Sequence, residues 1–204
     1  MKALPAIVVL AAGAGSRFRG SAHKLLQPFG RSSVLGVTLT HALATELPVV
    51  VVTTALLADE ARCHIASRDV VLLPAVGTSD TEPLGMGYSI AAGVAARPDA
   101  SGWLVLPGDM PLATPETMLD VARALAHHPV AYAQHLGRRG HPVGFAAELF
   151  TELATLRGDE GARRLIARYP AYGVEVPDAG VLLDVDTEAD LEEVRRREPV
   201  RVTN

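Results

Sequence analysis

Apolar runs of mostly β-branched residues recur along the chain, and segments with helical spacing separate them. Four of these runs contain no polar residue and lie at 7–10, 49–52, 70–73 and 103–106. Such runs are typical of parallel strands that are buried on both faces of a sheet. Because strands and helices alternate, the pattern predicts an α/β fold with a mostly parallel sheet and helices on both faces.

The remaining segments predict the helices and the last strands. Ser32 and Ser33 can cap a helix whose apolar face includes Leu35 and Leu39. Further helices are expected at 56–66, at 89–96, after Thr114 with Pro115 in the first turn, at 146–156, after the 158–161 segment and after Thr187. Further strands are expected at 130–134, at 138–144 after a glycine-rich turn, and at 181–185 as the last strand.

The segment directly after the first strand is the strongest chemical signal. Small residues at 11–15 allow a sharp turn that leaves backbone N–H groups open to an anionic ligand. Arg17 and Lys24 follow this turn, and both suit polyphosphate, since Arg offers a planar fork of donors and Lys a mobile point charge. A solvated turn with incidental charges is the alternative.

Two other phosphate-binding loops do not match the same segment. A P-loop requires Lys and then Ser or Thr after its second glycine, but Ser21 and Ala22 follow Gly20. A dinucleotide-binding G-x-G-x-x-G loop would need its third glycine where the chain has Phe18.

Asp109 is a candidate metal ligand, and two later aspartates are free for another task. Asp109 lies three residues beyond the run at 103–106, and it is not needed as a helix cap because Thr114 can cap the next helix. Mg²⁺ prefers oxygen ligands and takes few of them from the protein when phosphate is bound, so a carboxylate there favours metal over an Asx turn. Asp184 and Asp186 are also free, since Thr187 and Asp190 form a capping-box-like start to the last helix.

Two further motifs carry open alternatives. Gly85, Gly87 and Ser89 lie before and at the start of an expected helix, where they could bind a nucleotide or Ser89 could simply cap the helix. His141 lies in an extended G-H-P-V segment without a nearby Cys or carboxylate, so it suits a substrate contact or a structural hydrogen bond better than Zn²⁺.

Composition narrows the function classes. The 204 residues are 49% hydrophobic and 21% charged, which excludes a disordered chain, and they suffice for one large core. A net charge of −4 argues against binding nucleic acid or an anionic membrane. We expect a cytoplasmic protein, because no run reaches membrane-span length and the lone Cys63, expected on the core side, can form no internal disulfide.

The candidate groups favour positioning and charge neutralisation over covalent catalysis. No Ser-His-Asp set or Cys-His pair is recognisable, whereas glycine-turn donors, two cations and two carboxylates are present. Nucleotidyl transfer needs such a set, because an acceptor phosphate is already ionised and requires no general base.

Several motifs together resemble the MobA-like NTP transferase family, which includes the molybdenum-cofactor cytidylyl- and guanylyltransferases. These motifs are LAAG-x-G-x-R followed by Lys24-Leu25-Leu26, GMGYS at 85–89, LPGDMP at 106–111, GHPV at 140–143, GDEGAR at 158–163 and DVDT at 184–187. The similarity spans roughly residues 6 to 194. The family usually has R-M-G-x-x-K, and here the segment from Arg17 to Lys24 is two residues longer.

The resemblance implies a Rossmann-like nucleotidyltransferase fold of the nucleotide-diphospho-sugar transferase type, as one domain over 1–204. It implies a Mg²⁺-dependent transfer of a nucleoside monophosphate to molybdopterin or molybdenum cofactor, and Ala12, which gives LAAG rather than LAGG, favours CTP. The implied site consists of catalytic Arg17, Lys24 and Asp109; nucleotide-binding Leu10, Ala11, Ala12, Gly13, Gly85, Gly87 and Ser89; the acceptor contact His141; and metal-binding Asp109 and Asp186.

Two alternatives remain open beside this function. One is a nucleotidyltransferase that uses another nucleoside triphosphate or another phosphorylated acceptor. The other is a non-catalytic nucleotide-binding chaperone of the cofactor. The implied partners are the nucleoside triphosphate, the molybdopterin-type acceptor and the molybdoenzyme or its chaperone.

Overall fold

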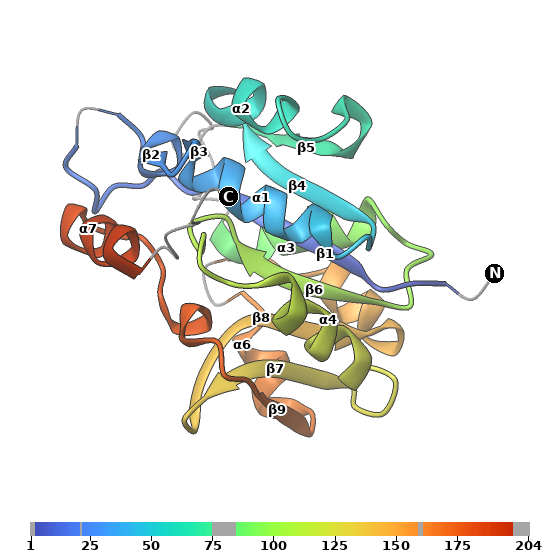
Figure 1. The fold of residues 1–204 in the computed structure, drawn as a ribbon. Coiled ribbons are helices and arrows are strands. Elements are labelled where there is room, and N and C mark those ends of the chain that lie inside the picture. The colour runs from blue at the N-terminus through green and yellow to red at the C-terminus, as the bar shows by residue number, and fades with distance from the viewer. Residues whose placement is uncertain (1–2, 21, 75–84, 159–160, 198–204) are drawn as a thin grey trace.

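A seven-stranded sheet forms the centre of the computed structural model, which describes residues 3–20, 22–74, 85–158 and 161–197 (Figure 1). The strand order is β5-β4-β1-β6-β8-β7-β9. The strands are β1 (Ala6–Ala11), β4 (Val49–Thr54), β5 (Val70–Leu73), β6 (Gly102–Pro107), β7 (Val130–His135), β8 (Arg138–Ala146) and β9 (Ala171–Glu175). β8 is antiparallel to β6 and β7 and the other pairings are parallel, which confirms the mostly parallel α/β fold.

Helices cover both faces of this sheet. The α-helices are α1 (Val34–Ala44), α2 (Ala58–Arg62), α3 (Gly85–Ala95), α4 (Pro115–Ala124), α5 (Phe150–Ala154), α6 (Arg163–Arg168) and α7 (Glu188–Arg197). Short 3₁₀ helices are η1 (Lys24–Leu26), η2 (Ala55–Leu57), η3 (Ser67–Asp69), η4 (Ala147–Leu149) and η5 (Ala179–Leu182), and β2 (Pro28–Phe29) pairs with β3 (Ser32–Ser33). None of the helices in the described ranges has the length and apolar character needed to cross a membrane.

The side chains of β1 alternate between two hydrophobic clusters. Ile7 and Val9 belong to a cluster with residues of α1, α4 and α7, whereas Ala6 and Val8 belong to one with residues of α3, α5 and α6. Both faces of the strand are thereby buried, as its uninterrupted apolar run predicts. The carboxyl ends of β1, β4, β6, β7 and β9 share one edge of the sheet, where ligands of such folds bind.

Several predicted elements have different bounds. α3 begins at Gly85, so Ser89 lies inside the helix and the N-cap alternative is wrong. The helices expected at 56–66 and 146–156 are each a 3₁₀ turn followed by a five-residue α-helix. Asp159 and Glu160 of the GDEGAR motif lie outside the described residues, as does most of the loop before α3.

The last predicted strand is also wrong. The 181–185 segment begins in η5, and its apolar spacing reflects burial of Val181 and Val185 in the core rather than strand pairing. The strand that completes the sheet is β9, which pairs in parallel with β7. β9 lies at the sheet edge and exposes Tyr172, so it lacks the apolar run of a central strand. Cys63 is exposed, contrary to expectation.

A polar group that we call the Asp178 cluster (Thr114, Thr117, Asp178 and Gly180) joins the start of α4 to η5. Oδ2 of Asp178 accepts hydrogen bonds from the Thr114 amide at 2.9 Å and the Thr117 hydroxyl at 3.0 Å. Its Oδ1 accepts from the Gly180 amide at 2.8 Å. Thr114 caps α4, as predicted. The cluster fixes the segment that leads from η5 to α7.

Candidate active site

The glycine turn after β1 is closed by a histidine from the far end of the same loop. Nε2 of His23 donates to the Gly13 carbonyl at 3.1 Å, and its Nδ1 accepts from the Leu25 amide at 3.2 Å. Gly15 has a φ of +62°, which favours glycine. His23 thereby ties the end of this segment to the turn, and Lys24 follows at the first position of η1.

Both predicted cations lie against predicted metal-binding carboxylates. Nζ of Lys24 donates to Oδ2 of Asp109 at 2.6 Å and to Oδ1 of Asp186 at 2.8 Å. The side chains of Lys24 and Asp109 are each 13% exposed and that of Asp186 is 20% exposed. Arg17 forms an ion pair with Oδ2 of Asp186 at 2.5 Å, and its side chain is 75% exposed. The fold thus brings together four residues that are up to 169 positions apart in the sequence, from 17 to 186.

A third carboxylate completes the group. Single oxygen atoms of Asp109, Asp184 and Asp186 all lie within 4.8 Å of one another. We call Arg17, Lys24 and these three aspartates the active-site cluster. The alternate spacing of Asp184 and Asp186 is the signal that could have added Asp184 to the sequence prediction, since alternate residues of an extended segment share a face.

The backbone fixes the carboxylates relative to one another. The Val185 amide donates to the Asp109 carbonyl at 3.0 Å, which ties the 184–186 segment to the turn after β6. A Cβ at Gly140 would collide with the Val181 carbonyl, so glycine there lets η5 lie against β8. Asp190 accepts from the Thr187 amide and hydroxyl at 2.7 and 2.8 Å, confirming the predicted cap of α7.

Electrostatics keep the lysine charged. Burial disfavours the ammonium of Lys24, but the charges and hydrogen bonds of Asp109 and Asp186 outweigh burial and raise its pKa. Burial, followed by the charge of Asp109, raises the pKa of Asp184. The cluster therefore concentrates negative charge that Lys24 and Arg17 only partly balance.

Two buried side-chain atoms in the described part of the chain have no hydrogen-bond partner, and both lie at this edge of the sheet. They are Oδ1 of Asp109 and Nδ1 of His141. His141 is in β8 two residues before Val143, which pairs with Val105 of β6. Burial lowers the pKa of His141, while the Asp109 charge and the Val105 carbonyl oppose that shift. A buried acceptor without a donor is unfavourable, so Oδ1 of Asp109 suits a cation.

The predicted nucleotide-binding residues come from two places. Leu10 to Gly13 form the end of β1 and the turn, where Ala11 and Ala12 are buried and Gly13 is exposed. Gly85, Gly87 and Ser89 belong to the first turns of α3. The Gly87 amide donates to the Gly158 carbonyl at 2.9 Å, and a Cβ at Gly87 would lie 2.8 Å from the Arg157 carbonyl oxygen. Close packing alone therefore accounts for Gly87, and its nucleotide contact stays a prediction.

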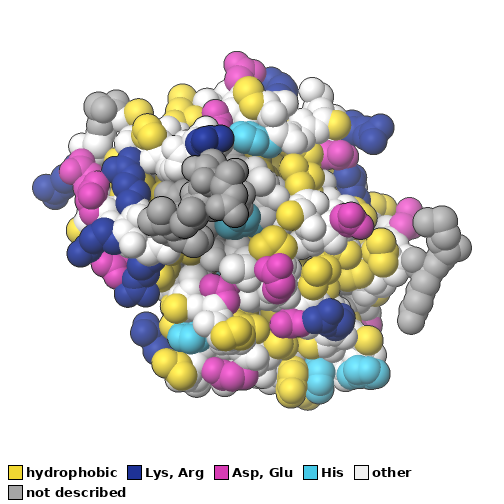
Figure 2. Space-filling view, viewed as in Figure 1, with side chains coloured by type: hydrophobic (Ala, Val, Ile, Leu, Met, Phe, Trp, Pro, Cys, Tyr) yellow, Lys and Arg dark blue, Asp and Glu magenta, His cyan; other side chains and the backbone are white. Residues whose placement is uncertain are grey.

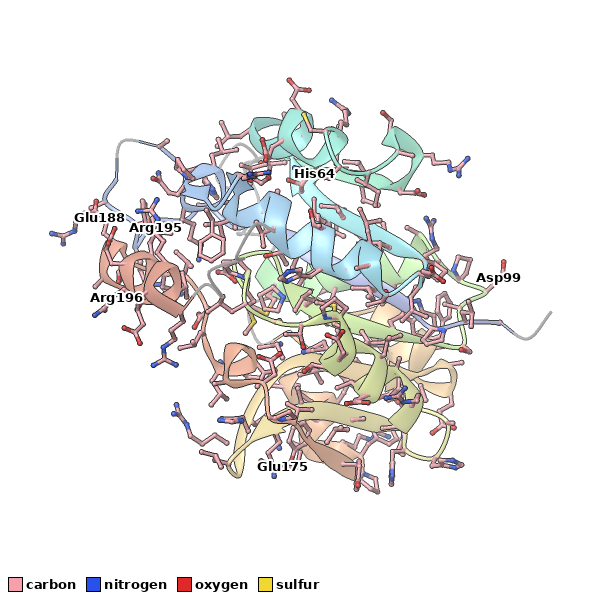
Figure 3. The ribbon with its side chains drawn as sticks, viewed as in Figure 1. His64, Asp99, Glu175, Glu188, Arg195 and Arg196 are labelled. Atoms are coloured by element: carbon pink, nitrogen blue, oxygen red, sulfur yellow. The ribbon has the colours of Figure 1, made fainter. Side chains whose placement is uncertain are left out.

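A cavity of about 600 Å³ opens beside the cluster between the loop and α7. Its lining residues are Ser16, Arg17, Arg19, Thr187, Glu188 and Ala189. Glu188 lies at the start of α7, well away from Asp99 (Figure 3). Lys and Arg side chains gather at the α7 side of the molecule (Figure 2), where Arg195, Arg196 and Arg197 form the last turn of the helix. The cavity lies where a polyphosphate could reach Arg17.

Comparison with known proteins identifies the family. The model of the MobA-like NTP transferase domain matches residues 7–173, which include Arg17, Lys24, Asp109 and His141. The chain belongs to the MobA-like NTP transferase family. This confirms the resemblance seen in the sequence and makes the protein a nucleotidyltransferase by family. The match ends before Asp184 and Asp186.

Relatives among curated proteins differ in coverage. The purine catabolism protein PucB of Bacillus subtilis is 28% identical over 207 residues, which cover 94% of this chain and 97% of PucB. The bifunctional protein GlmU of Halorhodospira halophila is 36% identical over 118 residues, or 58% of this chain. The aligned part is only 24% of the length of that GlmU.

Solved structures confirm the nucleotidyltransferase fold. Rv0371c from Mycobacterium tuberculosis H37Rv superimposes with a TM-score of 0.80 at 28% identity, covering 96% of this chain and 99% of that one. A structure of Rv0371c in complex with manganese gives a TM-score of 0.78, also at 28% identity, over 96% of this chain and 100% of that one. A nucleotidyl transferase from Methanothermobacter, at 23% identity, shares the fold with a TM-score of 0.75 over 95% and 97% of the two chains.

Proposed function

We propose that this protein transfers CMP from CTP to the phosphate of molybdopterin or molybdenum cofactor and releases pyrophosphate. The observation that carries the chemistry is the active-site cluster, in which two cations and three carboxylates meet beside the glycine turn at the carboxyl edge of the sheet. With a divalent cation on the carboxylates, such a set could offset the charge of a triphosphate and position it, which is what nucleotidyl transfer requires.

Asp109, Asp184 and Asp186 would hold the divalent cation, for which we propose Mg²⁺. Their oxygens are close enough to share one ion, and Oδ1 of Asp109 is a buried acceptor that has no donor among the described residues. The manganese complex of Rv0371c adds support from a relative. When bound, the ion would supply positive charge to the oxygens of the α-phosphate.

Arg17 and Lys24 would bind the β- and γ-phosphates, which leave as pyrophosphate. The exposed Arg17 at the 600 Å³ cavity can offer a bidentate fork, and Lys24 a point charge that follows the leaving oxygen. Backbone amides around Gly13 would add uncharged donors. The acceptor phosphate is ionised at neutral pH, so no general base is needed, and we propose that His141 contacts the acceptor.

The nucleotide base is assigned to Leu10, Ala11, Ala12 and Gly13 together with the start of α3. Support for cytosine comes from Ala12, since LAGG is typical of the guanylyl-transferring relatives that the family resemblance brings in, and this chain has LAAG. We propose that Gly85, Gly87 and Ser89 flank the base. Because the Gly87 amide is already engaged by Gly158, any base contact there would use Ser89 or another group of the turn.

Transfer to a different acceptor is the second candidate. The relatives favour it in one respect, because PucB is named for purine catabolism and GlmU is called bifunctional, so related chains carry other roles. In this candidate the active-site cluster performs the same chemistry, and the nucleotide or the acceptor differs. A third candidate is a nucleotide-binding chaperone that hands the cofactor to a molybdoenzyme without turnover.

Pyrophosphate release distinguishes the three candidates. The protein is incubated with Mg²⁺, molybdopterin and CTP, GTP or ATP in turn, and nucleotide affinity is measured in parallel by calorimetry. We expect release with CTP and a preference over GTP worth about 1 to 3 kcal/mol, the cost of one unmatched buried polar group. A preference for GTP or ATP would exclude cytidylyl transfer but would leave nucleotidyl transfer from another triphosphate possible. Tight binding without release would favour the chaperone.

A further inference from the structure

Lys24 and the proposed metal ion compete for the same carboxylate oxygens. Its Nζ already lies 2.6 Å from Oδ2 of Asp109 and 2.8 Å from Oδ1 of Asp186. Mg²⁺ would need oxygens of these carboxylates at about 2.1 Å, which would bring it next to the ammonium. Like charges that share ligand oxygens in a partly buried site repel strongly, because solvent screens them little.

We propose that Lys24 is an exchangeable cation, which balances the carboxylates in the free protein and moves to the nucleotide phosphates when a divalent cation takes its place. This inference rests on the proposed function, since it needs a triphosphate beside the glycine turn. It adds that metal and nucleotide binding are coupled through one side chain.

The charges of the active-site cluster favour such an exchange. Asp109, Asp184 and Asp186 carry three negative charges, whereas Lys24 and Arg17 carry two positive ones. A divalent cation that arrives alone must displace the ammonium without giving it a new partner. A divalent cation that arrives with a triphosphate brings that partner, so the two ligands bind together more favourably than separately.

The fold allows the side chain to move while the backbone stays fixed. Lys24 begins η1, in which the Leu26 amide donates to the His23 carbonyl at 2.9 Å and Leu25 is buried in the core. His23 in turn holds the Gly13 carbonyl. The lysine is thus anchored directly beside the turn where the phosphates are proposed, and rotation about its side-chain bonds suffices to reach them.

The main experiment needs no nucleotide. Mn²⁺ is titrated into wild-type protein and Lys24→Met, and free Mn²⁺ is measured by electron paramagnetic resonance. If Lys24 competes with the ion, the variant binds Mn²⁺ about tenfold more tightly, within the usual range of coupling between sites. Unchanged or weaker Mn²⁺ binding by Lys24→Met would overturn the inference.

The matched control is Arg19→Met, which removes one positive charge from the adjacent cavity. Arg19 lines that cavity with Arg17, and the described residues give it no ion pair with a carboxylate. We expect its Mn²⁺ affinity to stay within about twofold of wild type, because at the surface a single charge is screened. An equal gain in Mn²⁺ affinity in both variants would mean that only the overall positive charge near the site matters, and would also overturn the inference.

A second measurement uses wild-type protein and therefore does not depend on the folding of a variant. Mn²⁺ affinity is compared with and without α,β-methylene-CTP, after correction for the Mn²⁺ complex of the analogue in solution. We expect the analogue to strengthen Mn²⁺ binding at least about fivefold, and Mn²⁺ to strengthen analogue binding by the same factor. Binding of both ligands without coupling contradicts the exchange. Failure of the analogue to bind contradicts the proposed function instead, and the nucleotide-free comparison still decides the exchange.

Discussion

Asp109 and Asp178 are both partly buried aspartates, yet the fold treats them in opposite ways. The two oxygens of Asp178 receive three hydrogen bonds, all from uncharged donors of its own neighbourhood. One oxygen of Asp109 accepts a hydrogen bond from the ammonium of Lys24, and the other has no partner in the described part of the chain. Both oxygens of Asp178 thus accept hydrogen bonds from fixed groups of the fold, whereas Asp109 depends on the side chain of Lys24, which we propose can move away.

The difference separates a structural carboxylate from one that is suited to a ligand. Amide and hydroxyl donors at fixed positions stabilise α4 and η5, and a ligand could replace them only by unfolding both. Charged partners at the end of a long side chain can be exchanged for a cation or a phosphate. Substitutions in the two clusters should therefore affect different properties of the protein.

The largest effect is expected from Asp109→Asn, which keeps the shape and removes the charge. Turnover should fall about a hundredfold or more, corresponding to about 3 kcal/mol of transition-state stabilisation. The melting temperature should change little, because Lys24 keeps its contact with Asp186. Steady-state kinetics at saturating Mg²⁺ and thermal unfolding check both parts.

Asp99→Asn is the matched control, because Asp99 is exposed and lies at the opposite side of the molecule from Glu188 (Figure 3). We expect normal turnover from it. Near-normal turnover in Asp109→Asn would mean that Asp109 is only a turn residue, and the contrast with Asp178 would lose its functional meaning.

Arg17→Ala should weaken triphosphate binding by about 1.5 to 3 kcal/mol, the value of one charge-assisted hydrogen bond. Arg19→Ala should cost less, although both arginines line the same cavity, because Arg17 occupies the family position and contacts Asp186. Calorimetric titration with CTP compares the two. Equal losses would show that the cavity attracts phosphate only through its general charge.

Asp178→Ala should lower the free energy of unfolding by about 1 to 3 kcal/mol, since it leaves the Thr114 and Gly180 amides without their acceptor. Activity per folded molecule should remain normal. Urea unfolding and kinetics at a temperature where the variant is folded test the two statements. Loss of turnover in fully folded protein would contradict the structural role.

A smaller effect on stability is expected from a change in pH, because His141 is harder to protonate in the folded protein. Burial lowers its pKa in the folded protein, so below its ordinary value of 6.5 the unfolded chain takes up a proton that the folded chain resists. Stability should therefore fall as the pH drops from 6.5 towards the lowered pKa, and be unaffected above 6.5.

His141→Gln should lack this contribution. Urea unfolding of both proteins at about pH 7.5 and pH 5.5 isolates it, because the other histidines are common to both. The stability difference between wild type and variant should shift in favour of the variant at the lower pH. No shift would mean that His141 is as easily protonated in the folded protein as in the unfolded chain.

A residue of the active-site cluster can be predicted from the sequence when its position follows from neighbouring residues, and cannot when its position depends on tertiary contacts. Arg17 and Asp109 lie in the turn segments that follow buried strands, so the strand pattern alone places them at the same edge. Asp186 could be added only through the family resemblance, because η5 and the tie between Val185 and Asp109 depend on tertiary packing. For Asp178 only the Gly180 amide is a local partner, and its Thr114 and Thr117 donors lie on another element.

The strands show the same limit. Buried central strands such as β1 and β6 are apolar throughout and were predicted almost to their bounds. β9 is an edge strand in which exposed Tyr172 and Glu175 interrupt the apolar positions, so its pairing with β7 decides its structure. Val181 and Val185 are buried although their segment pairs with no strand. An apolar sequence pattern cannot distinguish such residues from those of a paired strand.

Because His23 is hydrogen-bonded to Gly13, the position of Lys24 does not depend on the length of the loop between Gly13 and His23. Lys24 takes its place from η1 and from this clasp, not from the number of residues that separate it from Arg17. Residues could therefore be added or removed between Arg17 and His23 while the lysine kept its position. We expect the loop to accept a grafted reporter peptide next to the candidate active site, and relatives that differ in length here need not differ in chemistry.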